Sequence, residues 1–275
     1  TNAKALEIEK ERKSIRIRRG REEVRVETEV LIAADGSFSR TARSIGLDLR
    51  ASPYNYSPVL QYVMENITVE DDVVEMYMGR EYAPGGYTWI IPRGDGTANV
   101  GLGIRSPFYE RGTTIHEFLQ RFIRRHPAAS SKLKEGIIIS RVGGLMPVGG
   151  PIPKTATDDI MVVGDAAGHV MASNGGGVPP ALVCGEIAGE TAANRINNGV
   201  CLSLYEEMWR SEVGEELNTS LKVREMGDLA MKSDDFMNGI LEILGPKNIG
   251  EMIRCRLPLG LAQLYRLAMK VKKHL

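Results

Sequence analysis

The chain lacks several features that would assign a protein class at once. Its 275 residues contain only three cysteines, Cys184, Cys201 and Cys255, with no CxxC pair and no Cys/His cluster. This spacing argues against a disulfide framework and against structural zinc, so we expect no metal site. Lysine plus arginine and aspartate plus glutamate both number 35, so no excess of positive charge favours nucleic acid as a partner.

Long apolar runs are also missing. No stretch approaches the roughly 18 residues of a membrane span, and no signal-peptide pattern opens the sequence, which predicts a cytoplasmic protein. Residues 254–273 carry six basic side chains and no acidic one. Such a basic amphipathic end can lie on an anionic membrane surface, at the inner face of the cell membrane, or form a solvated helix end.

The most informative pattern lies at residues 160–193. The apolar run 160–163 predicts a buried strand, and Gly164-Asp165-Ala166-Ala167-Gly168 predicts a tight turn after it. Gly175-Gly176-Gly177 then leads into a helix expected from about Pro179 to Ile196, where prolines are tolerated in the first turn. An acid at a strand end, followed by bare backbone at a helix start, suits a ligand that carries phosphate or a large ring.

A similar order of buried strand, acidic turn and helix is predicted earlier, at residues 30–45, after a β-hairpin. Alternating residues at 14–19 and 23–29 predict a β-hairpin with a solvated, mostly basic face. Residues 30–34 then predict a buried parallel strand, followed by an Asp35-Gly36 turn. Residues 39–45 read as a short helix capped by Ser37 or Ser39.

The middle of the chain predicts an antiparallel sheet. Strand patterns cover 54–67, 73–78, 87–92 and 97–104, with a Gly94-Asp95-Gly96 turn between the last two. Gly101 and Gly103 share a strand face, which either admits a bulky group or relieves packing. An amphipathic helix is expected at 113–125, a strand at 137–139, and a Gly/Pro-rich link up to residue 151. Helices follow at 202–221, 223–231, 236–244 and from 249, broken near Pro258.

Three of these elements together resemble the hydroxylase-type FAD-binding fold. They are the GDAAG turn, the Ala34-Asp35-Gly36 turn with Ser39 and Arg40, and, between these two turns in the sequence, the hairpin of strands 87–92 and 97–104. Within that fold, the run from Pro84 through Tyr87, Trp89 and Pro92 to Gly101 and Gly103 is similar to the PxxYxWxFP signature of the geranylgeranyl reductases, including archaeal digeranylgeranylglycerophospholipid reductases. Ile91 stands where the signature has phenylalanine. The resemblance covers roughly residues 6–198.

The resemblance implies an α/β fold with α+β elements: the C-terminal part of the FAD-binding fold, an antiparallel substrate-domain sheet and a helical C-terminus. Residues 1–50 and 151–200 would belong to the FAD-binding domain, 51–150 to the substrate domain and 201–275 to a helical region. The family's first FAD element, a GxGxxG turn, has no counterpart before Asp35. The chain would therefore be the C-terminal part of a longer protein or a truncated homologue.

The family's site residues transfer to matching positions only. FAD would contact Gly164, Asp165, Gly168, Gly176, Gly177, Val178, Asp35 and Gly36, with Asp165 accepting hydrogen bonds from the ribityl hydroxyls. Tyr87, Trp89, Pro92 and Gly101 would line the substrate site. No residue is assigned as the catalytic proton donor, since His169 and Cys184 both suit structural roles.

The implied activity is flavin-dependent reduction of isoprenoid C=C bonds in geranylgeranyl chains of archaeal-type ether-lipid precursors. The implied partners are an isoprenoid lipid and an electron donor, which would be a ferredoxin, a deazaflavin or NAD(P)H. Two alternatives stay open: another flavoenzyme of this fold, such as a monooxygenase or halogenase, and a non-catalytic truncated homologue.

Overall fold

The structure is a computed structural model that describes residues 2–9, 14–47, 52–108, 112–258 and 260–261. It divides into two compact units. Unit 1 comprises Thr1–Arg50 and Gly149–Leu221, and unit 2 comprises Ala51–Val148 and Lys222–Leu275. Most of the basic segment 254–273 lies outside the described residues, so its expected helix and membrane contact belong to the sequence alone.

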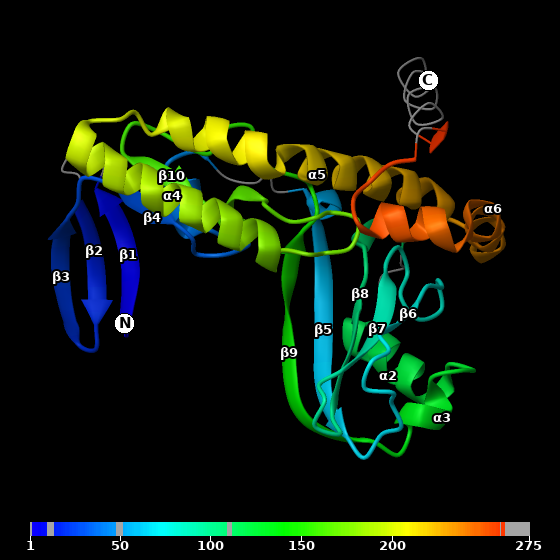
Figure 1. The fold of residues 1–275 in the computed structure, drawn as a ribbon. Coiled ribbons are helices and arrows are strands. Elements are labelled where there is room, and N and C mark those ends of the chain that lie inside the picture. Colours follow the sequence, from blue (N-terminus) through cyan, green and yellow to red (C-terminus); the bar gives the residue numbers. More distant parts are fainter. Residues whose placement is uncertain (1, 10–13, 48–51, 109–111, 259, 262–275) are drawn as a thin grey trace. The chain divides into compact units, whose positions relative to one another are not determined.

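Unit 1 holds a three-stranded meander and a short parallel sheet (Figure 1). Its elements are β1 (Ala3–Glu9), β2 (Ser14–Arg19), β3 (Glu22–Glu27), β4 (Leu31–Ala33), α1 (Arg40–Ser44), β10 (Ile160–Val162), the 3-10 turn η4 (Gly164–Ala167), α4 (Val178–Asn198) and the first part of α5 (Ser203–Ala230). The predicted hairpin is present, and β1 adds a third antiparallel strand to it. The short helix α1 begins after Ser39, whose side chain accepts from the Ala42 N–H and caps it.

The two strands that precede the acidic turns pair in parallel with each other, as the apolar run 30–34 predicts for its own strand. Ile160, Met161 and Val162 of β10 lie opposite Leu31, Ile32 and Ala33 of β4. β10 is fully buried, but Ile32 is 38% exposed, so the prediction of a fully buried β4 is wrong. The core of unit 1 forms around β10, where Met161, Val163, Cys184, Ala188, Leu202, Tyr205, Trp209 and Leu217 pack together.

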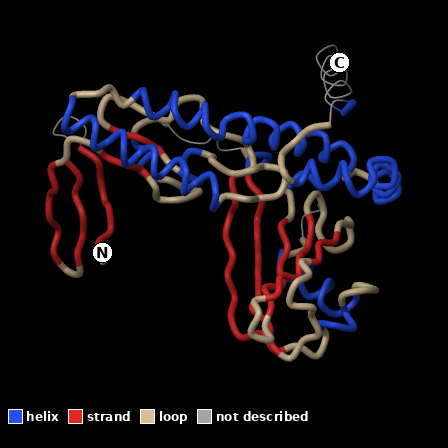
Figure 2. Tube along the Cα trace, in the orientation of Figure 1, coloured by secondary structure: helices blue, strands red, loops and turns tan. Residues whose placement is uncertain are grey.

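Unit 2 is built on one antiparallel sheet of five strands, in the order β6-β7-β8-β5-β9. Its elements are β5 (Tyr56–Glu65), β6 (Glu75–Tyr77), β7 (Tyr87–Pro92), β8 (Ala98–Gly103), α2 (Ile115–Arg125), α3 (Ser130–Leu133), β9 (Ile137–Pro147), the end of α5 and α6 (Asp234–Ile253). Figure 2 shows β5 and β9 as long neighbouring strands. A capping box between Thr114 and Glu117 starts α2, which packs Phe118, Leu119 and Phe122 against one sheet face.

Three predicted element bounds are wrong, each where glycine or polar composition was taken as a break. β9 runs on through Gly143 and Gly144, which pair with Leu60 and Val59, instead of ending at residue 139. α5 is continuous across residue 222, because nothing there removes a backbone donor or forces a positive φ. α6 breaks at Gly245-Pro246, where Gly245 has φ +66°, so the predicted helix end at residue 244 is confirmed, but the next helical segment begins directly after this kink rather than at residue 249.

The end of α5 is tied to the sheet of unit 2 by a buried charged cluster. Arg105, just after β8, pairs with Asp228 and donates to the Tyr54 carbonyl at 3.1 Å. Arg224 adds a second cation 3.5 Å from Asp228 and donates to the same carbonyl. Burial raises the pKa of Asp228 despite both arginines, and burial lowers the pKa of Arg105.

Removing this shared carboxylate should destabilise unit 2. In Asp228→Ala the two guanidinium groups lose their anion, and we expect a loss of about 2 kcal/mol, less than for a fully buried pair because Asp228 is partly exposed. Urea unfolding would measure it. Glu215→Ala, an exposed acid on the same helix, is the matched control and should change stability by less than about 0.5 kcal/mol. Equal losses in the two variants would contradict the assignment.

Candidate functional site

Two acidic residues predicted from the sequence come together at one edge of the parallel sheet in unit 1. Asp35 and Asp165 follow β4 and β10, and carboxyl ends of parallel strands meet at the same edge. The loop after β4 reaches the other acid directly, because Ser37 Oγ donates to Asp165 Oδ2 at 3.0 Å. Ser37 thus orients the Asp165 carboxylate and belongs to the site.

The two acids have different local surroundings. Asp35 accepts from Ser39 Oγ at 2.5 Å and from the Thr41 N–H at 3.1 Å, so both of its oxygens serve the start of α1. Partial burial is the largest single effect and raises the pKa of Asp35, but the hydrogen bonds together outweigh it, so the pKa lies below its usual value. Gly36 supplies the positive φ, +81°, that turns the chain between strand and helix. Asp35 therefore shapes the loop that carries Ser37.

The GDAAG turn places Asp165 by tight backbone geometry. Residues 164–167 form a 3-10 turn with Gly164 at φ +66°, and it ends in Gly168 at φ +72°. The Gly168 N–H donates to the Asp165 carbonyl at 3.1 Å. Both glycines therefore occupy left-handed positions that other residues rarely adopt, which explains the spacing of this motif.

His169 stabilises the GDAAG turn through its buried side chain. Its side chain is fully buried, its Nδ1 accepts from the Gly164 N–H at 3.3 Å, and its ring centroid lies 4.5 Å from that of Trp209. Trp209 in turn donates from Nε1 to Thr155 Oγ1 at 2.8 Å. Burial, helped by nearby Arg210, lowers the pKa of His169 to about 3. The imidazole is neutral and structural.

This histidine should make stability depend on pH. Because its folded pKa of about 3 lies below the ordinary value of 6.5, the unfolded chain binds the extra proton, and stability falls as pH drops from about 6.5 towards 3. His169→Asn keeps an acceptor for Gly164 and cannot titrate. Between pH 6 and 4 its stability should fall less steeply than that of the wild type, by up to about 1.4 kcal/mol per pH unit. Parallel curves from urea unfolding would contradict this.

The glycine-rich approach to α4 is an ordered loop. Gly175 N–H donates to the Met171 carbonyl at 2.7 Å, and Met171 N–H donates to the Gly176 carbonyl at 3.0 Å. Asn174 Oδ1 accepts the Gly176 N–H at 2.8 Å, so this donor is committed within the loop. Gly177 then serves as the N-cap of α4, and within the part of the chain that the structure describes no side chain caps this helix start.

The start of α4 has only two free backbone N–H donors, those of Gly177 and Val178, among the described residues. Pro179 and Pro180 have no N–H, which leaves the backbone donors of Gly177 and Val178 at the positive end of the helix. A Cβ added to Gly177 would lie 3.3 Å from Asp165 Oδ1. The Asp165 carboxylate therefore lies beside the two uncapped backbone N–H groups, with no side chain of Gly177 between them. This donor set fits a ligand that presents a hydroxyl to Asp165 and an acceptor edge to the helix start.

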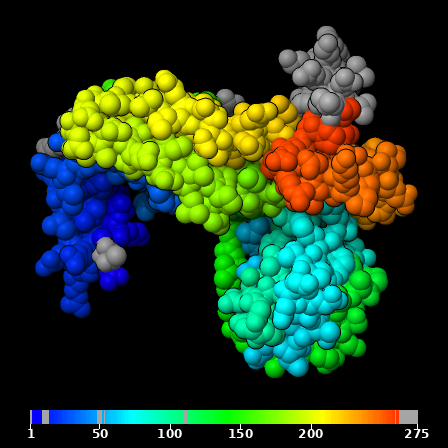
Figure 3. All heavy atoms as spheres, in the orientation of Figure 1, coloured from blue at the N-terminus to red at the C-terminus, as the bar shows by residue number. Residues whose placement is uncertain are grey.

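The first turns of α4 also carry exposed apolar side chains. Val178 is 72% exposed and Leu182, one turn later, is 68% exposed. α4 forms part of the visible surface of unit 1 in Figure 3. Farther along the helix Cys184 is fully buried, and burial raises its pKa to about 12. It is an inert core thiol, as the sequence suggests.

The predicted substrate residues divide between the two faces of the unit 2 sheet. Tyr87 and Trp89 lie on the face opposite α2, with ring centroids 5.8 Å apart, while Thr88 and Ile90 are buried under α2. Pro92 has the parity of Thr88 and Ile90, so it does not share a face with the two aromatics. Burial raises the pKa of Tyr87, which stays protonated.

The space over Gly101 is taken by the chain itself. A Cβ added there would lie 2.5 Å from Trp89 Cζ2, so the indole rests on Gly101. Of the two readings of this glycine, packing therefore explains it. Gln61, which no motif marks, accepts a hydrogen bond from Trp89 Nε1 at 3.0 Å. Its only signal in the sequence is a polar residue within the otherwise apolar run 58–64.

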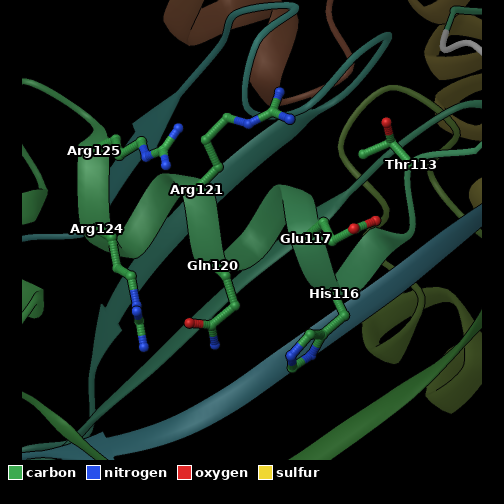
Figure 4. A pocket seen from close by; sticks show the side chains of 7 residues that line it. All are labelled: Thr113, His116, Glu117, Gln120, Arg121, Arg124 and Arg125. Carbon is green, nitrogen blue, oxygen red and sulfur yellow. The ribbon is translucent and has the colours of Figure 1, made fainter.

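A hollow of about 490 Å³ lies elsewhere in unit 2, along the outer face of α2. Figure 4 shows its lining, Thr113, His116, Glu117, Gln120, Arg121, Arg124 and Arg125, with arginines on both sides of the helix. Such a charged lining does not suit an apolar ligand. Among the described residues, none of the helices has the length and hydrophobicity needed to cross a bilayer.

The comparisons with known proteins agree on one family. Residues 55–146 match the model of the geranylgeranyl reductase catalytic domain. The digeranylgeranylglycerophospholipid reductase of Methanocaldococcus jannaschii is 41% identical over 230 residues, which are 82% of this chain and 56% of that protein. A second such reductase, from Methanothermobacter thermautotrophicus, is 38% identical over 84% of this chain and 58% of its own length. The chain thus spans just over half the length of these relatives.

Solved structures give the same fold. A geranylgeranyl bacteriochlorophyll reductase-like protein from Thermoplasma acidophilum superposes with a TM-score of 0.73 at 29% identity, covering 84% of this chain and 58% of that one. The flavin-dependent brominase Bmp2 reaches a TM-score of 0.64 at 15% identity, covering 95% of this chain and 67% of its own, which shows the fold alone. On the sequence matches, the chain is a member of the geranylgeranyl reductase-like family.

Proposed function

We propose that the chain supplies half of an FAD site and the substrate sheet of an enzyme that reduces isoprenoid C=C bonds in the geranylgeranyl chains of archaeal-type ether-lipid precursors. One observation carries the proposal: Asp165 faces an uncapped helix start in the same chain as the Tyr87/Trp89 sheet, which lies in the segment matched by the catalytic-domain family. The matched relatives are named as reductases of digeranylgeranylglycerophospholipid.

Unit 1 would act as the flavin-binding part. The Asp165 carboxylate, oriented by Ser37, would accept a hydrogen bond from a ribityl hydroxyl, and the backbone donors of Gly177 and Val178 would hold the pyrimidine edge of the ring. The positive end of α4 favours negative charge at that edge, by at most about 2 kcal/mol. FAD supplies the hydride when bound. Gly164, Gly168 and Gly176 keep the backbone in position, and Asp35 with Gly36 forms the loop beneath.

Unit 2 would act as the substrate part. An isoprenoid chain offers no charge to grip, so catalysis must rest on positioning and on exclusion of water. Tyr87 and Trp89 provide a wide apolar surface with neighbouring rings, and Ile91 extends it along β7. Pro92 ends β7, and Gly101, which has no side chain, leaves room for the Trp89 indole to lie over it.

The partners follow from this chemistry. The lipid substrate lies in a membrane, and we infer that the basic segment 254–273 holds the protein at the inner face of the cell membrane. Reduction consumes two electrons per double bond, so an external donor is required: a ferredoxin, a deazaflavin or NAD(P)H.

The proposal is tested with a hybrid in which this chain is joined to those residues of the M. jannaschii relative that lie outside the matched region. The purified hybrid should carry bound FAD, and under argon with a chemical reductant it should add two hydrogens per double bond to digeranylgeranylglycerophospholipid, measured by mass spectrometry. Oxygen consumption with an oxygenated product would instead favour a monooxygenase, and absence of flavin would refute the proposal.

A further inference from the structure

One row of side chains crosses the face of the unit 2 sheet that lies opposite α2. Trp89 of β7 lies opposite Gly101 of β8, and Gly101 lies opposite Gln61 of β5. The indole crosses the missing side chain of Gly101 and donates from Nε1 to Gln61 Oε1 at 3.0 Å. An indole N–H can only donate, so the facing atom of Gln61 must be its oxygen.

The row fixes the indole from two directions. Below it, the Gly101 position leaves no free space, since an added Cβ would lie 2.5 and 2.6 Å from two indole carbons. At its far edge, the Gln61 carboxamide sets its rotation about the side-chain bonds. Without that acceptor the half-buried N–H would have to turn towards solvent, because an unsatisfied buried donor is unfavourable.

We propose that Gln61 is a positioning residue, which holds the Trp89 indole flat across Gly101 as a fixed platform for the isoprenoid chain. The inference rests on the proposed function and adds to it a residue outside the aromatic signature. Since an alkene presents only shape to the protein, the position of its carbons on the sheet depends on how rigid this surface is. Gln61 therefore acts through Trp89.

The platform is tested first by the exchange of the indole N–H. The chain has two tryptophans, so a 15N–1H spectrum shows two indole signals, which Trp89→Phe assigns. In Gln61→Leu the Trp89 signal should shift, and its hydrogen should exchange with D2O about tenfold faster. Gln61→Glu keeps an acceptor oxygen and should restore slow exchange. The Trp209 signal is an internal reference, because its N–H binds Thr155 in the other unit.

The functional consequence is measured on the flavin-loaded hybrid. Gln61→Leu should lower kcat/KM for the lipid about tenfold, and Gln61→Glu should stay within about threefold of the wild type. The matched control is Gln120→Leu, the same change on the outer face of α2, which should alter neither readout. Unchanged Trp89 exchange in Gln61→Leu would overturn the proposal, and so would faster exchange with normal kcat/KM. A wild-type hybrid without reductase activity would refute the proposed function, while the exchange experiment still decides whether Gln61 holds Trp89.

Discussion

Asp165→Ala should weaken FAD binding by the hybrid about hundredfold. The variant removes the carboxylate that Ser37 orients and that faces Gly177, and a hydrogen bond to a charged acceptor contributes about 1.5–3 kcal/mol. Titration of the apoprotein with FAD, followed by quenching of flavin fluorescence, would give the Kd. Because Asp165 lies on a well-packed turn, urea unfolding of the same variant would show whether the fold survives.

Two further variants separate charge from geometry at this site. Asp165→Asn keeps an acceptor oxygen, so its Kd should rise about tenfold, between those of the wild type and the alanine variant. Asp72→Ala removes an exposed acid in unit 2 and should leave the Kd unchanged. If Asp165→Ala folds and binds FAD like the wild type, Asp165 is not a flavin contact, and the assignment of unit 1 loses its main support.

Gly86→Ala should destabilise unit 2 by about 3 kcal/mol, the upper end of the cost of overpacking. An added Cβ would lie 2.1 Å from the Gly103 carbonyl oxygen and 2.9 Å from its carbon, both on the backbone of the neighbouring strand. Backbone atoms cannot turn aside as a side chain can, so β7 and β8 would have to separate where Tyr87 pairs with Gly103. The free energy of urea unfolding measures the loss.

The sheet contains a matched control for this substitution. Among the described residues, no atom lies within 4 Å of a Cβ added to Gly144 in β9, and this glycine has no positive φ, so Gly144→Ala should stay within about 0.5 kcal/mol of the wild type or stabilise slightly. Similar losses at the two glycines would show that the close approach of Gly86 to Gly103 does not occur in solution.

Local patterns predicted the parts of the site that depend on one stretch of chain. An apolar run followed by Gly-Asp gave the end of β10 and the position of Asp165, and two prolines after Gly177 gave the start of α4. The strand predicted at 87–92 implies that Tyr87 and Trp89 face one way and Thr88 and Ile90 the other, as the burial pattern shows. These features depend on backbone geometry that the residue types themselves dictate.

Contacts between distant residues could not be predicted in this way. Ser37 reaches Asp165 across 128 positions, and Gln61 reaches Trp89 across 28, and neither pair carries a motif. Gly101 illustrates the same limit, because a bare position on a strand is compatible with a ligand or with a neighbouring side chain. Only the register of β7 against β8 shows that Trp89 fills it.

The proposal that this chain completes a flavin enzyme that reduces isoprenoid double bonds can be tested by a single turnover under argon. The FAD-loaded hybrid is reduced chemically until its visible flavin absorption is bleached, and excess reductant is removed. Addition of digeranylgeranylglycerophospholipid should then restore the oxidised spectrum, with one double bond lost per flavin reoxidised. A flavin that stays bleached with the lipid, and is reoxidised only when air is admitted, would show that this enzyme does not reduce the lipid.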